Sequence, residues 1–393
     1  MGAIVEDLDG VYLITGPARL TRRRGSIEVF SAEIEEEIVV PAGRSIPVLA
    51  RRASAEIHPG PSVVNKGDKE VYEAFKEAAL KVSEIEGRIL LVGPTDSGKS
   101  TLAAWAASLR DLTGSRSWLM TVDVGQNEVY APGFEAVTAV KAPYIPGWSK
   151  NNERIFSCFV GSTSPTRSLV RYFACAAKLA RRPGSDYLIV DTDGWIELWD
   201  GIISKSVLAD ILDAEVVFVG IDEWLSSRIS RTLTPALKLP RLSPRSKSRE
   251  ERRLHRERLL ASRLIGSKKM LLNLEEAMVI DSPIYRCKPV DSPQVTGIRT
   301  AVYAEECQDG FIVVARYKPR ARIPGVKAVL EEGWERGLIV ALDPGGHEPQ
   351  HHLAVIERIN YKRKLVTLHT KYEGKVEQVI FGRGMKIAWP PKY

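Results

Sequence analysis

The sequence predicts an α/β protein in which a P-loop domain with a parallel sheet is flanked by small N-terminal and C-terminal β domains. Three observations predict this architecture. The stretch GPTDSGKST at 93–101 lies between an apolar run and a helical pattern. Apolar runs of strand length alternate with helical patterns over 88–266, and short β patterns occupy both ends of the chain. Continuous apolar strands joined by helical crossovers are typical of a parallel sheet with helices on both faces.

The N-terminal part consists of short alternating segments that are separated by turn sequences such as PAGR. This spacing predicts a β-sandwich-like domain. A linker composition follows in HPGPSVVNKGD, and then a helical pattern with one apolar face ends at Gly87. The β pattern returns near the C-terminus, for example in FIVVARYK and LVTLHTKY. We therefore expect three domains, over 1–68, 69–268 and 269–393.

Composition limits the classes of protein that the sequence fits. With 393 residues, the chain is too long for a single core. Its apolar runs are far shorter than the ~20 residues of a membrane span, and its first residues lack a signal-peptide pattern. We expect no membrane partner and a cytoplasmic location. The four cysteines are far apart without metal-ligand spacing, which predicts buried free thiols in a reducing compartment. The net charge of +7 gives weak support for a polyanionic partner.

The stretch GPTDSGKS matches the phosphate-binding pattern GxxxxGK[ST] without a gap. Its backbone amides can bind phosphate oxygens, Lys99 can reach the β and γ phosphates, and Ser100 can offer its hydroxyl to Mg²⁺. The alternative is a glycine turn that happens to precede a lysine. The base-reading sequence of a switch GTPase does not follow the loop. The predicted nucleotide-binding residues are Gly93, Pro94, Thr95, Asp96, Ser97, Gly98, Lys99, Ser100 and Thr101.

Two carboxylates are predicted at the carboxyl ends of strands, where ligands bind in parallel sheets. Asp123 ends SWLMTVD and can orient or deprotonate a hydroxyl group or hold Mg²⁺, although it can also simply cap the next turn. Asp191 ends YLIVD and resembles the strand aspartate that holds Mg²⁺ in P-loop enzymes. Gln126 follows Asp123 in a turn that can lie beside a phosphate. Trp195 can stack on a base or belong to the core.

A basic segment follows the last predicted strand of the central domain. From Arg241 to Arg263 there are nine Lys or Arg residues and three Glu residues. A solvated helix would have more balanced charges. We interpret the segment as a lid whose arginines close over a transferring phosphoryl group; an exposed charged helix is the alternative.

Together these motifs resemble the polyribonucleotide 5′-hydroxyl kinases, which are related to the kinase subunit of the mRNA 3′-end cleavage factor and to pre-rRNA-processing kinases. The resemblance rests on the phosphate loop, on VDVGQ…PG at 122–133, on GSTSP at 161–165, on DGW at 193–195 and on the arginine segment. The resemblance rests on specific motifs in the central domain, and only on the layout of the domains at both ends of the chain. The chain resembles archaeal-type members of this family, and this resemblance implies a cytoplasmic location.

The resemblance implies roles for single residues. Asp123 becomes the general base or hydroxyl orienter, Gln126 lies near metal and phosphates, and Trp195 clamps a substrate base. Ser100, Asp123, Gln126 and Asp191 are the implied metal site. The implied RNA contacts are Thr163, Ser164, Trp195, Gln126 and Arg245, and the implied catalytic residues are Lys99, Asp123, Arg252, Arg253 and Arg256.

One position departs from the family pattern. Asp191 stands where the family usually has Asn, and Asp193 adds a second charge. Metal or arginine must neutralise these two charges. Either they strengthen Mg²⁺ binding or Asp191 and Asp123 partly exchange roles, and the sequence leaves both options open.

The implied activity is transfer of the γ-phosphate from ATP or another NTP to the 5′-hydroxyl of RNA, with Mg²⁺; DNA stays open as a second acceptor. Protein partners are not predicted. The main alternatives are a nucleotide-binding scaffold of an RNA-processing complex and an ATPase that remodels RNA or protein.

Overall fold

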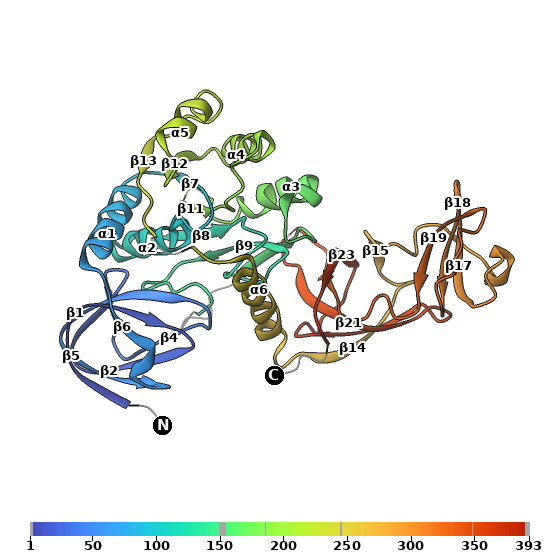
Figure 1. The fold of residues 1–393 in the computed structure, drawn as a ribbon, viewed down its shortest axis with the longest axis horizontal. Helices are drawn as coiled ribbons and strands as arrows, with labels where there is room; N and C mark the ends of the chain where they lie inside the picture. Colours follow the sequence, from blue (N-terminus) through green and yellow to red (C-terminus); the bar gives the residue numbers. More distant parts are fainter. Residues whose placement is uncertain (1–2, 149–154, 185, 244–245, 348, 390–393) are drawn as a thin grey trace. The chain divides into compact units, whose positions relative to one another are not determined.

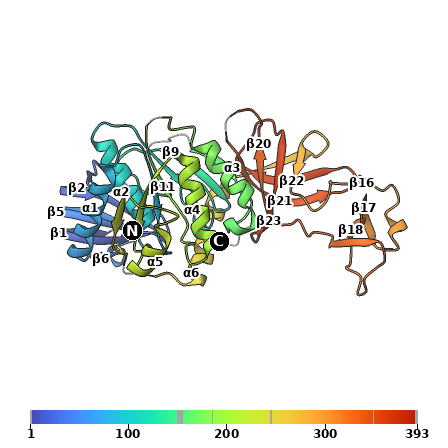
Figure 2. The same cartoon turned by 90° about the horizontal axis from the view of Figure 1, so that it is seen from above.

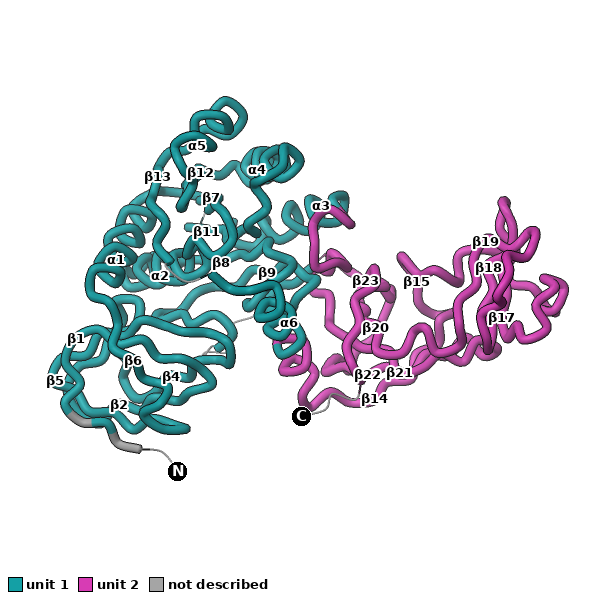
Figure 3. Tube along the Cα trace, viewed as in Figure 1, with its two compact units in different colours: residues 1–158, 169–258 teal, residues 159–168, 259–393 magenta. Residues whose placement is uncertain are grey.

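A computed structural model describes residues 3–148, 155–184, 186–243, 246–347 and 349–389 (Figure 1). The chain packs into two compact units (Figure 3). Unit 1 comprises Met1–Cys158 and Leu169–Arg258, and unit 2 comprises Phe159–Ser168 and Leu259–Tyr393. The N-terminal sheet and the P-loop sheet thus belong to one unit. The division into three domains stays a prediction.

The N-terminal part of unit 1 is one six-stranded sheet with the order β3-β2-β5-β1-β6, in which β4 also pairs with β2. Its main strands are longer than the sequence predicts, because β-bulges let pairing continue through the charged residues Arg22 and Arg24. Burial alternates along β5, which gives the sheet one core face. The strands are β1 (Ala3–Thr15), β2 (Ala18–Val29), β3 (Ala32–Glu33), β4 (Glu37–Val40), β5 (Ser45–His58) and β6 (Val64–Lys66).

The second sheet of unit 1 has the order β10-β9-β8-β11-β7-β12-β13. Strands β8, β11, β7 and β12 pair in parallel as predicted. Two strands were not predicted: β13, which is parallel to β12, and β9, which is antiparallel to β8. The sheet is therefore mixed. Its strands are β7 (Arg88–Val92), β8 (Ser117–Thr121), β9 (Phe134–Ala139), β10 (Ile155–Phe159), β11 (Tyr187–Asp191), β12 (Glu215–Val219) and β13 (Leu237–Leu239).

Helices cover both faces of this sheet (Figures 1 and 2). The crossover from β7 through α2 to β8 and the crossover from β11 through α4 to β12 run in opposite directions along the sheet. Because such crossovers are right-handed, α2 and α4 lie on opposite faces. The helices are α1 (Lys69–Ser83), α2 (Lys99–Leu112), α3 (Leu169–Leu179), α4 (Trp199–Leu212), α5 (Glu223–Ile229) and α6 (Arg249–Leu264), with short 3₁₀ helices η1 (Pro61–Val63), η2 (Pro165–Arg167) and η3 (Pro293–Thr296).

An aromatic cluster joins the two sheets of unit 1. The fully buried Trp105 of α2 contacts the rings of Phe30, Tyr72 and Phe75. Its indole N–H donates to the hydroxyl of Ser31 at 3.0 Å. Helices α1 and α2 thus share their core with the N-terminal sheet as well as with the P-loop sheet.

Unit 2 contains two sheets. The six-stranded sheet has the order β14-β22-β21-β20-β23-β15 and the four-stranded sheet has the order β16-β17-β18-β19. Their strands are β14 (Lys268–Asn273), β15 (Met278–Ile280), β16 (Lys288–Pro289), β17 (Ala301–Cys307), β18 (Gly310–Ala315), β19 (Val326–Glu331), β20 (Leu338–Asp343), β21 (His352–Asn360), β22 (Leu365–Thr370) and β23 (Gln378–Lys386). The β-rich C-terminal part that the sequence predicts is confirmed. Among the described residues, no helix has the length and apolar character of a membrane span.

All four cysteines are paired, so the prediction of free thiols is wrong. Cys158 of β10 is bonded to Cys175 of α3, and Cys287 is bonded to Cys307 at the end of β17. The Cα atoms of the pairs are 5.4 Å and 5.2 Å apart. Each pair depends on which strand or helix lies beside which, and sequence spacing does not carry that information. The inference of a reducing compartment loses its basis.

The Cys158–Cys175 bond closes a loop with a sequence separation of 17 residues. Replacing both cysteines by serine should lower the free energy of unfolding by about 3 kcal/mol, because the unfolded chain gains conformational freedom. The measurement is thermal unfolding with and without dithiothreitol. Reductant should lower the Tm of the wild type and leave a variant with all four cysteines changed to serine unaffected. Free thiols detected in the denatured, unreduced protein would contradict the pairing.

Candidate functional site

The P-loop has the predicted strand–loop–helix order, from β7 through residues 93–98 to α2. Two of its glycines are required by packing. Gly98 has a φ of +103°, and a Cβ there would lie 3.0 Å from Phe75 and 3.1 Å from Leu242. A Cβ on Gly93 would overlap the carbonyl oxygen of Val219 at the end of β12. The loop is therefore held tightly between α1 and the neighbouring strand, with its amides at the start of α2.

Lys99 is buried inside this loop, with 5% of its surface exposed. Its Nζ donates to the carbonyl oxygens of Gly93 and Pro94, both at 2.8 Å. Burial lowers the pKa of Lys99, and the nearby carboxylates of Asp191 and Asp123 act in the opposite direction. The ammonium group of Lys99 thus lies inside the loop, held by two of its backbone carbonyl groups.

Asp191 ends β11 and is buried beside the P-loop helix. It lies opposite Leu91 of β7 and Thr121 of β8 in the parallel register. Burial raises the pKa of Asp191 to about 6, although Lys99 and a hydrogen bond from Ser100 oppose the rise. Its Oδ1 is buried and has no hydrogen-bond partner among the described residues. A buried carboxylate oxygen without a partner, next to a serine hydroxyl, matches the donor set that Mg²⁺ prefers.

Asp123 follows β8 at the same edge of the sheet. Its Oδ1 accepts hydrogen bonds from the backbone N–H groups of Gly125 and Gln126, both at 2.9 Å. The turn-capping interpretation is therefore correct for one oxygen. No described residue donates a hydrogen bond to the other oxygen, Oδ2. Burial and the nearby Asp193 raise the pKa of Asp123.

Asp193 is neutralised by a residue that the sequence did not suggest. The Nζ of Lys205, on α4, lies 2.7 Å from Asp193 Oδ2 in a fully buried position. The hydroxyl of Tyr172 donates to the same oxygen at 3.0 Å, and the N–H of Trp195 donates to Oδ1 at 2.8 Å. The expectation that a metal or an arginine balances this charge is wrong for Asp193. Lys205 does so, because α4 packs against the loop after β11.

The half-buried Trp195 is connected to the P-loop through its neighbour Gly194. A Cβ on Gly194 would overlap the backbone and hydroxyl of Thr95. The loop after β11 thus lies directly on the phosphate loop, as the position of its strand beside β7 requires.

The basic segment after β13 contacts the P-loop through Asp96. The Oδ2 of Asp96 accepts hydrogen bonds from Arg252 Nη2 at 3.0 Å and from the Lys247 backbone at 2.9 Å. The Leu242 N–H also donates to the carbonyl of Ser97. Asp96 therefore anchors the start of the lid segment, in addition to its place in the phosphate loop.

The other predicted lid and substrate residues are placed differently. Arg253 pairs with Glu257 on the exposed side of α6, whereas Arg256 is half-buried. Arg245 lies outside the described residues. Thr163 and Ser164 lie in Phe159–Ser168, which packs with unit 2. Their contact with substrate stays a prediction.

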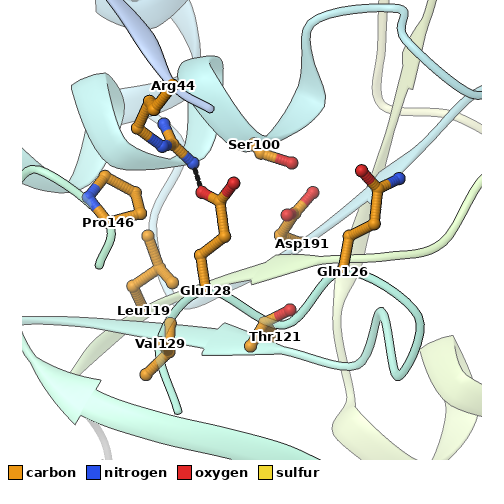
Figure 4. A pocket seen from close by; sticks show the side chains of 9 residues that line it. All are labelled: Arg44, Ser100, Leu119, Thr121, Gln126, Glu128, Val129, Pro146 and Asp191. Atoms are coloured by element: carbon orange, nitrogen blue, oxygen red, sulfur yellow. Dashed lines mark ion pairs between the residues drawn. The ribbon is translucent and has the colours of Figure 1, made fainter. Parts of the chain in front are cut away.

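A pocket beside Asp191 contains a charge network that the sequence did not predict (Figure 4). Arg44, in the turn between β4 and β5, forms a buried ion pair with Glu128. His255 of α6 contacts the other oxygen of Glu128 at 3.0 Å through Nε2. Burial lowers the pKa of Arg44 to about 10. The pocket is lined by Arg44, Ser100, Leu119, Thr121, Gln126, Glu128, Val129, Pro146 and Asp191.

Glu128 thus connects the N-terminal sheet with the lid helix beside the predicted metal residues. No local motif marks Arg44, Glu128 or His255. They lie on three separate segments and come together only in the folded chain. The nearest signal in the sequence is the position of Glu128 two residues after Gln126.

Comparison with known families identifies the central segment. Residues 93–262 match the family model described as "mRNA cleavage and polyadenylation factor CLP1 P-loop". This segment is therefore similar to the Clp1 P-loop family. The predicted resemblance to this kinase family is thereby confirmed for the P-loop part of the chain.

Two curated relatives support the family. The chain is 31% identical over 158 residues to "Protein CLP1 homolog" of Arabidopsis thaliana, and 30% identical over 173 residues to "Polyribonucleotide 5'-hydroxyl-kinase Clp1" of Danio rerio. The alignments cover 37% and 41% of this chain, and 35% and 38% of the two relatives. The chain therefore matches less than half of the length of these relatives.

The fold of the whole chain is also that of known Clp1 structures. A Clp1p–Pcf11p complex matches with a TM-score of 0.68 over 98% of both chains, at 14% identity. A second structure, of an extended interface between Pcf11p and Clp1p, matches with a TM-score of 0.66. The predicted arrangement of a P-loop domain between two β domains is confirmed.

The buried Arg44–Glu128 pair gives a prediction about the stability of the chain. Arg44→Met or Glu128→Gln should each lower the free energy of unfolding by about 3–5 kcal/mol, because each removes one charge of a buried ion pair and leaves the opposite charge uncompensated by it. The measurement is urea unfolding followed by tryptophan fluorescence. The double variant Arg44→Met/Glu128→Met should recover much of the loss.

The control for this prediction is an ion pair at the surface. Lys268 and Glu373 are exposed, so Lys268→Met should leave the free energy of unfolding almost unchanged. A loss of less than about 1 kcal/mol in both Arg44→Met and Glu128→Gln would contradict a buried pair.

His255 gives a prediction about pH. Burial, together with the cations Lys247, Arg44, Arg258 and Arg256, lowers the pKa of His255 to about 4, from 6.5. Between these values the unfolded chain binds a proton that the folded chain does not, so stability should fall as the pH falls from 6.5 to 4. The loss should reach up to about 3 kcal/mol and should be absent in His255→Gln. Urea unfolding at pH 4.5, 5.5 and 7 measures it, and equal pH dependence in both proteins would contradict the low pKa.

Proposed function

We propose that the chain is a polynucleotide 5′-hydroxyl kinase that transfers the γ-phosphate of ATP or another NTP to the 5′-hydroxyl of RNA. One observation carries the proposal: a P-loop lies beside two carboxylates that each keep one oxygen without a hydrogen-bond donor, Asp191 Oδ1 and Asp123 Oδ2. One oxygen suits a metal ion and the other suits a reacting hydroxyl group. The name of the Danio rerio relative, a polyribonucleotide 5′-hydroxyl-kinase, supports the same acceptor.

The donor triphosphate is proposed to bind along the loop at residues 93–101. The amides before α2 would bind phosphate oxygens, and Lys99 would exchange the carbonyl groups of Gly93 and Pro94 for β- and γ-phosphate oxygens. This exchange compensates for the burial that lowers the pKa of Lys99, because phosphate restores a negative partner.

Ser100 and Asp191 are proposed to hold Mg²⁺, with Asp123 and Gln126 as further candidates. Bound Mg²⁺ would neutralise charge on the β- and γ-phosphates. The unpartnered buried oxygen of Asp191 fits this role better than a structural one, because leaving it without a hydrogen bond costs free energy in the isolated chain.

In the proposed transfer, the acceptor 5′-oxygen forms a bond to the γ-phosphorus as the bond from that phosphorus to the bridging oxygen breaks. The hydroxyl proton passes to Asp123, and the nucleoside diphosphate leaves. The raised pKa of Asp123 makes it a better proton acceptor than an exposed aspartate. Trp195, Thr163 and Ser164 would contact the RNA.

The lid arginines divide into two proposed roles. Arg252 is paired with Asp96 and would hold α6 on the phosphate loop. Arg256, half-buried on the same helix, would supply positive charge to the transferring phosphoryl group, with Arg253 and Arg245 as further candidates.

The test uses the full chain with Mg²⁺, γ-labelled ATP and two matched single-stranded oligonucleotides, RNA and DNA, with 5′-hydroxyl ends. Lys99→Ala should abolish transfer. Asp123→Asn should lower the rate of transfer about 10²- to 10⁴-fold with ATP affinity retained. Asp222→Asn is the matched control, since Asp222 caps α5 after the neighbouring strand β12 and asparagine also caps helices.

Each outcome decides between functions. Transfer at the wild-type rate in Asp123→Asn would remove Asp123 from the mechanism. ATP binding without label on either oligonucleotide would overturn the kinase and favour a nucleotide-binding scaffold, and phosphate release to water alone would favour an ATPase.

A further inference from the structure

The four-stranded sheet of unit 2 presents a loop, residues 316–325, that connects two parallel strands. Because β18 and β19 run in the same direction, the chain must return along the length of the sheet between them. Both ends of the loop are fixed. The Arg316 N–H donates to the Thr300 carbonyl at 3.0 Å, and the Phe311 N–H donates to the Gly325 carbonyl at 2.8 Å. Ile323 packs against the small core of this sheet.

The loop itself carries positive charge only, and acidic residues such as Asp309, Glu331 and Glu332 flank it. The segments 292–304 and 310–330 contain no Asp or Glu. Lys327 pairs with Asp309, and Arg316 lies 4.0 Å from Glu332. The remaining cations form no ion pair with any described residue. The exposed cations of these segments are Arg299, Arg316, Lys318, Arg320, Arg322 and Lys327.

The neighbouring six-stranded sheet of the same unit is different. Several of its lysines are matched with glutamates, as in Lys268–Glu373, Lys364–Glu275 and Lys269–Glu357, although the exposed Lys362 and Arg363 form no ion pair with a described residue. A charged surface that only needs solubility resembles this second pattern, with both signs interspersed. The single sign of the 316–325 loop favours an anionic partner.

Tyr317 indicates which anion fits. It lies between Arg316 and Lys318 and is 71% exposed, the most exposed aromatic side chain among the large apolar residues of the described chain. A flat aromatic ring flanked by cations matches single-stranded nucleic acid, whose bases stack on aromatic rings while its phosphates meet Lys and Arg. An acidic peptide would use the cations and leave the ring without a partner.

We propose that residues 316–322, together with Arg299, form a binding surface for single-stranded nucleic acid. This proposal takes only one element from the proposed function, namely that the ligand is a nucleic acid. It concerns a surface of unit 2 that contains none of the residues assigned to phosphoryl transfer, so binding here and catalysis can be measured separately.

The experiment measures the affinity of the full chain for a fluorescent 5′-hydroxyl single-stranded RNA by anisotropy, at several salt concentrations. Lys318→Ser/Arg320→Ser/Arg322→Ser should weaken binding at least about tenfold and reduce the slope of log affinity against log salt by about 2, since each phosphate contact contributes about 0.7. Tyr317→Ala should weaken binding at least about fivefold at every salt concentration, because it removes stacking rather than charge.

The matched control removes the same charge from the other sheet, in Lys362→Ser/Arg363→Ser/Lys375→Ser, and should bind as the wild type does. A blunt-ended RNA duplex should show no dependence on Tyr317, because its bases are already stacked. Equal loss of affinity in the control and loop variants, or wild-type affinity in the loop variant, would overturn the proposal.

Measuring phosphate transfer and RNA binding separately distinguishes this inference from the kinase proposal. If wild type transfers no phosphate but binds RNA through the loop, the kinase proposal fails and this surface stands. If wild type transfers phosphate and the loop variants bind RNA normally, this surface fails and the kinase stands. Loop-dependent binding of polyaspartate with the same affinity as RNA would also overturn it, in favour of an acidic protein partner.

Discussion

The parallel pairing of β11 between β7 and β8 is the constraint on which the site depends. It aligns Asp191 with Leu91 near the end of β7 and with Thr121 at the end of β8, so the phosphate loop and both carboxylates emerge at one edge. Backbone hydrogen bonds fix this register, and a shift by one residue would turn Asp191 to the other face of the sheet. The site is thus a consequence of strand order and register before any side-chain contact is considered.

Local sequence was sufficient wherever the relevant contacts are local. The phosphate loop, the strands that flank it and the capping role of Asp123 all depend on residues within a few positions of each other, and each was predictable from its own stretch. The charge of the basic segment alone predicted a lid, and the family resemblance added roles for single residues in that segment and in the loop after β11. Strand β9 was missed because it pairs antiparallel to β8, so it lacks the crossover helix that marks the other strands.

The remaining features depend on residues that are far apart in the chain. No sequence pattern marks Lys205, and only the packing of α4 brings it to Asp193. Arg44, Glu128 and His255 come from a β turn, a loop and the lid helix, and each is unremarkable alone. The disulfides also join cysteines whose proximity depends on the packing of separate elements. Charge and burial can be inferred from composition, but which charges meet is a property of the folded chain.

Gly194 limits how far related sequences can diverge. A Cβ atom at this position would overlap the backbone of Thr95, so any side chain would enter the phosphate loop. Gly93 is limited in the same way by Val219. Substitution at either position cannot be compensated by rotating a neighbour, because the obstacle is main chain. A homologue with a larger residue at either position must therefore have a differently shaped site, whatever its overall similarity.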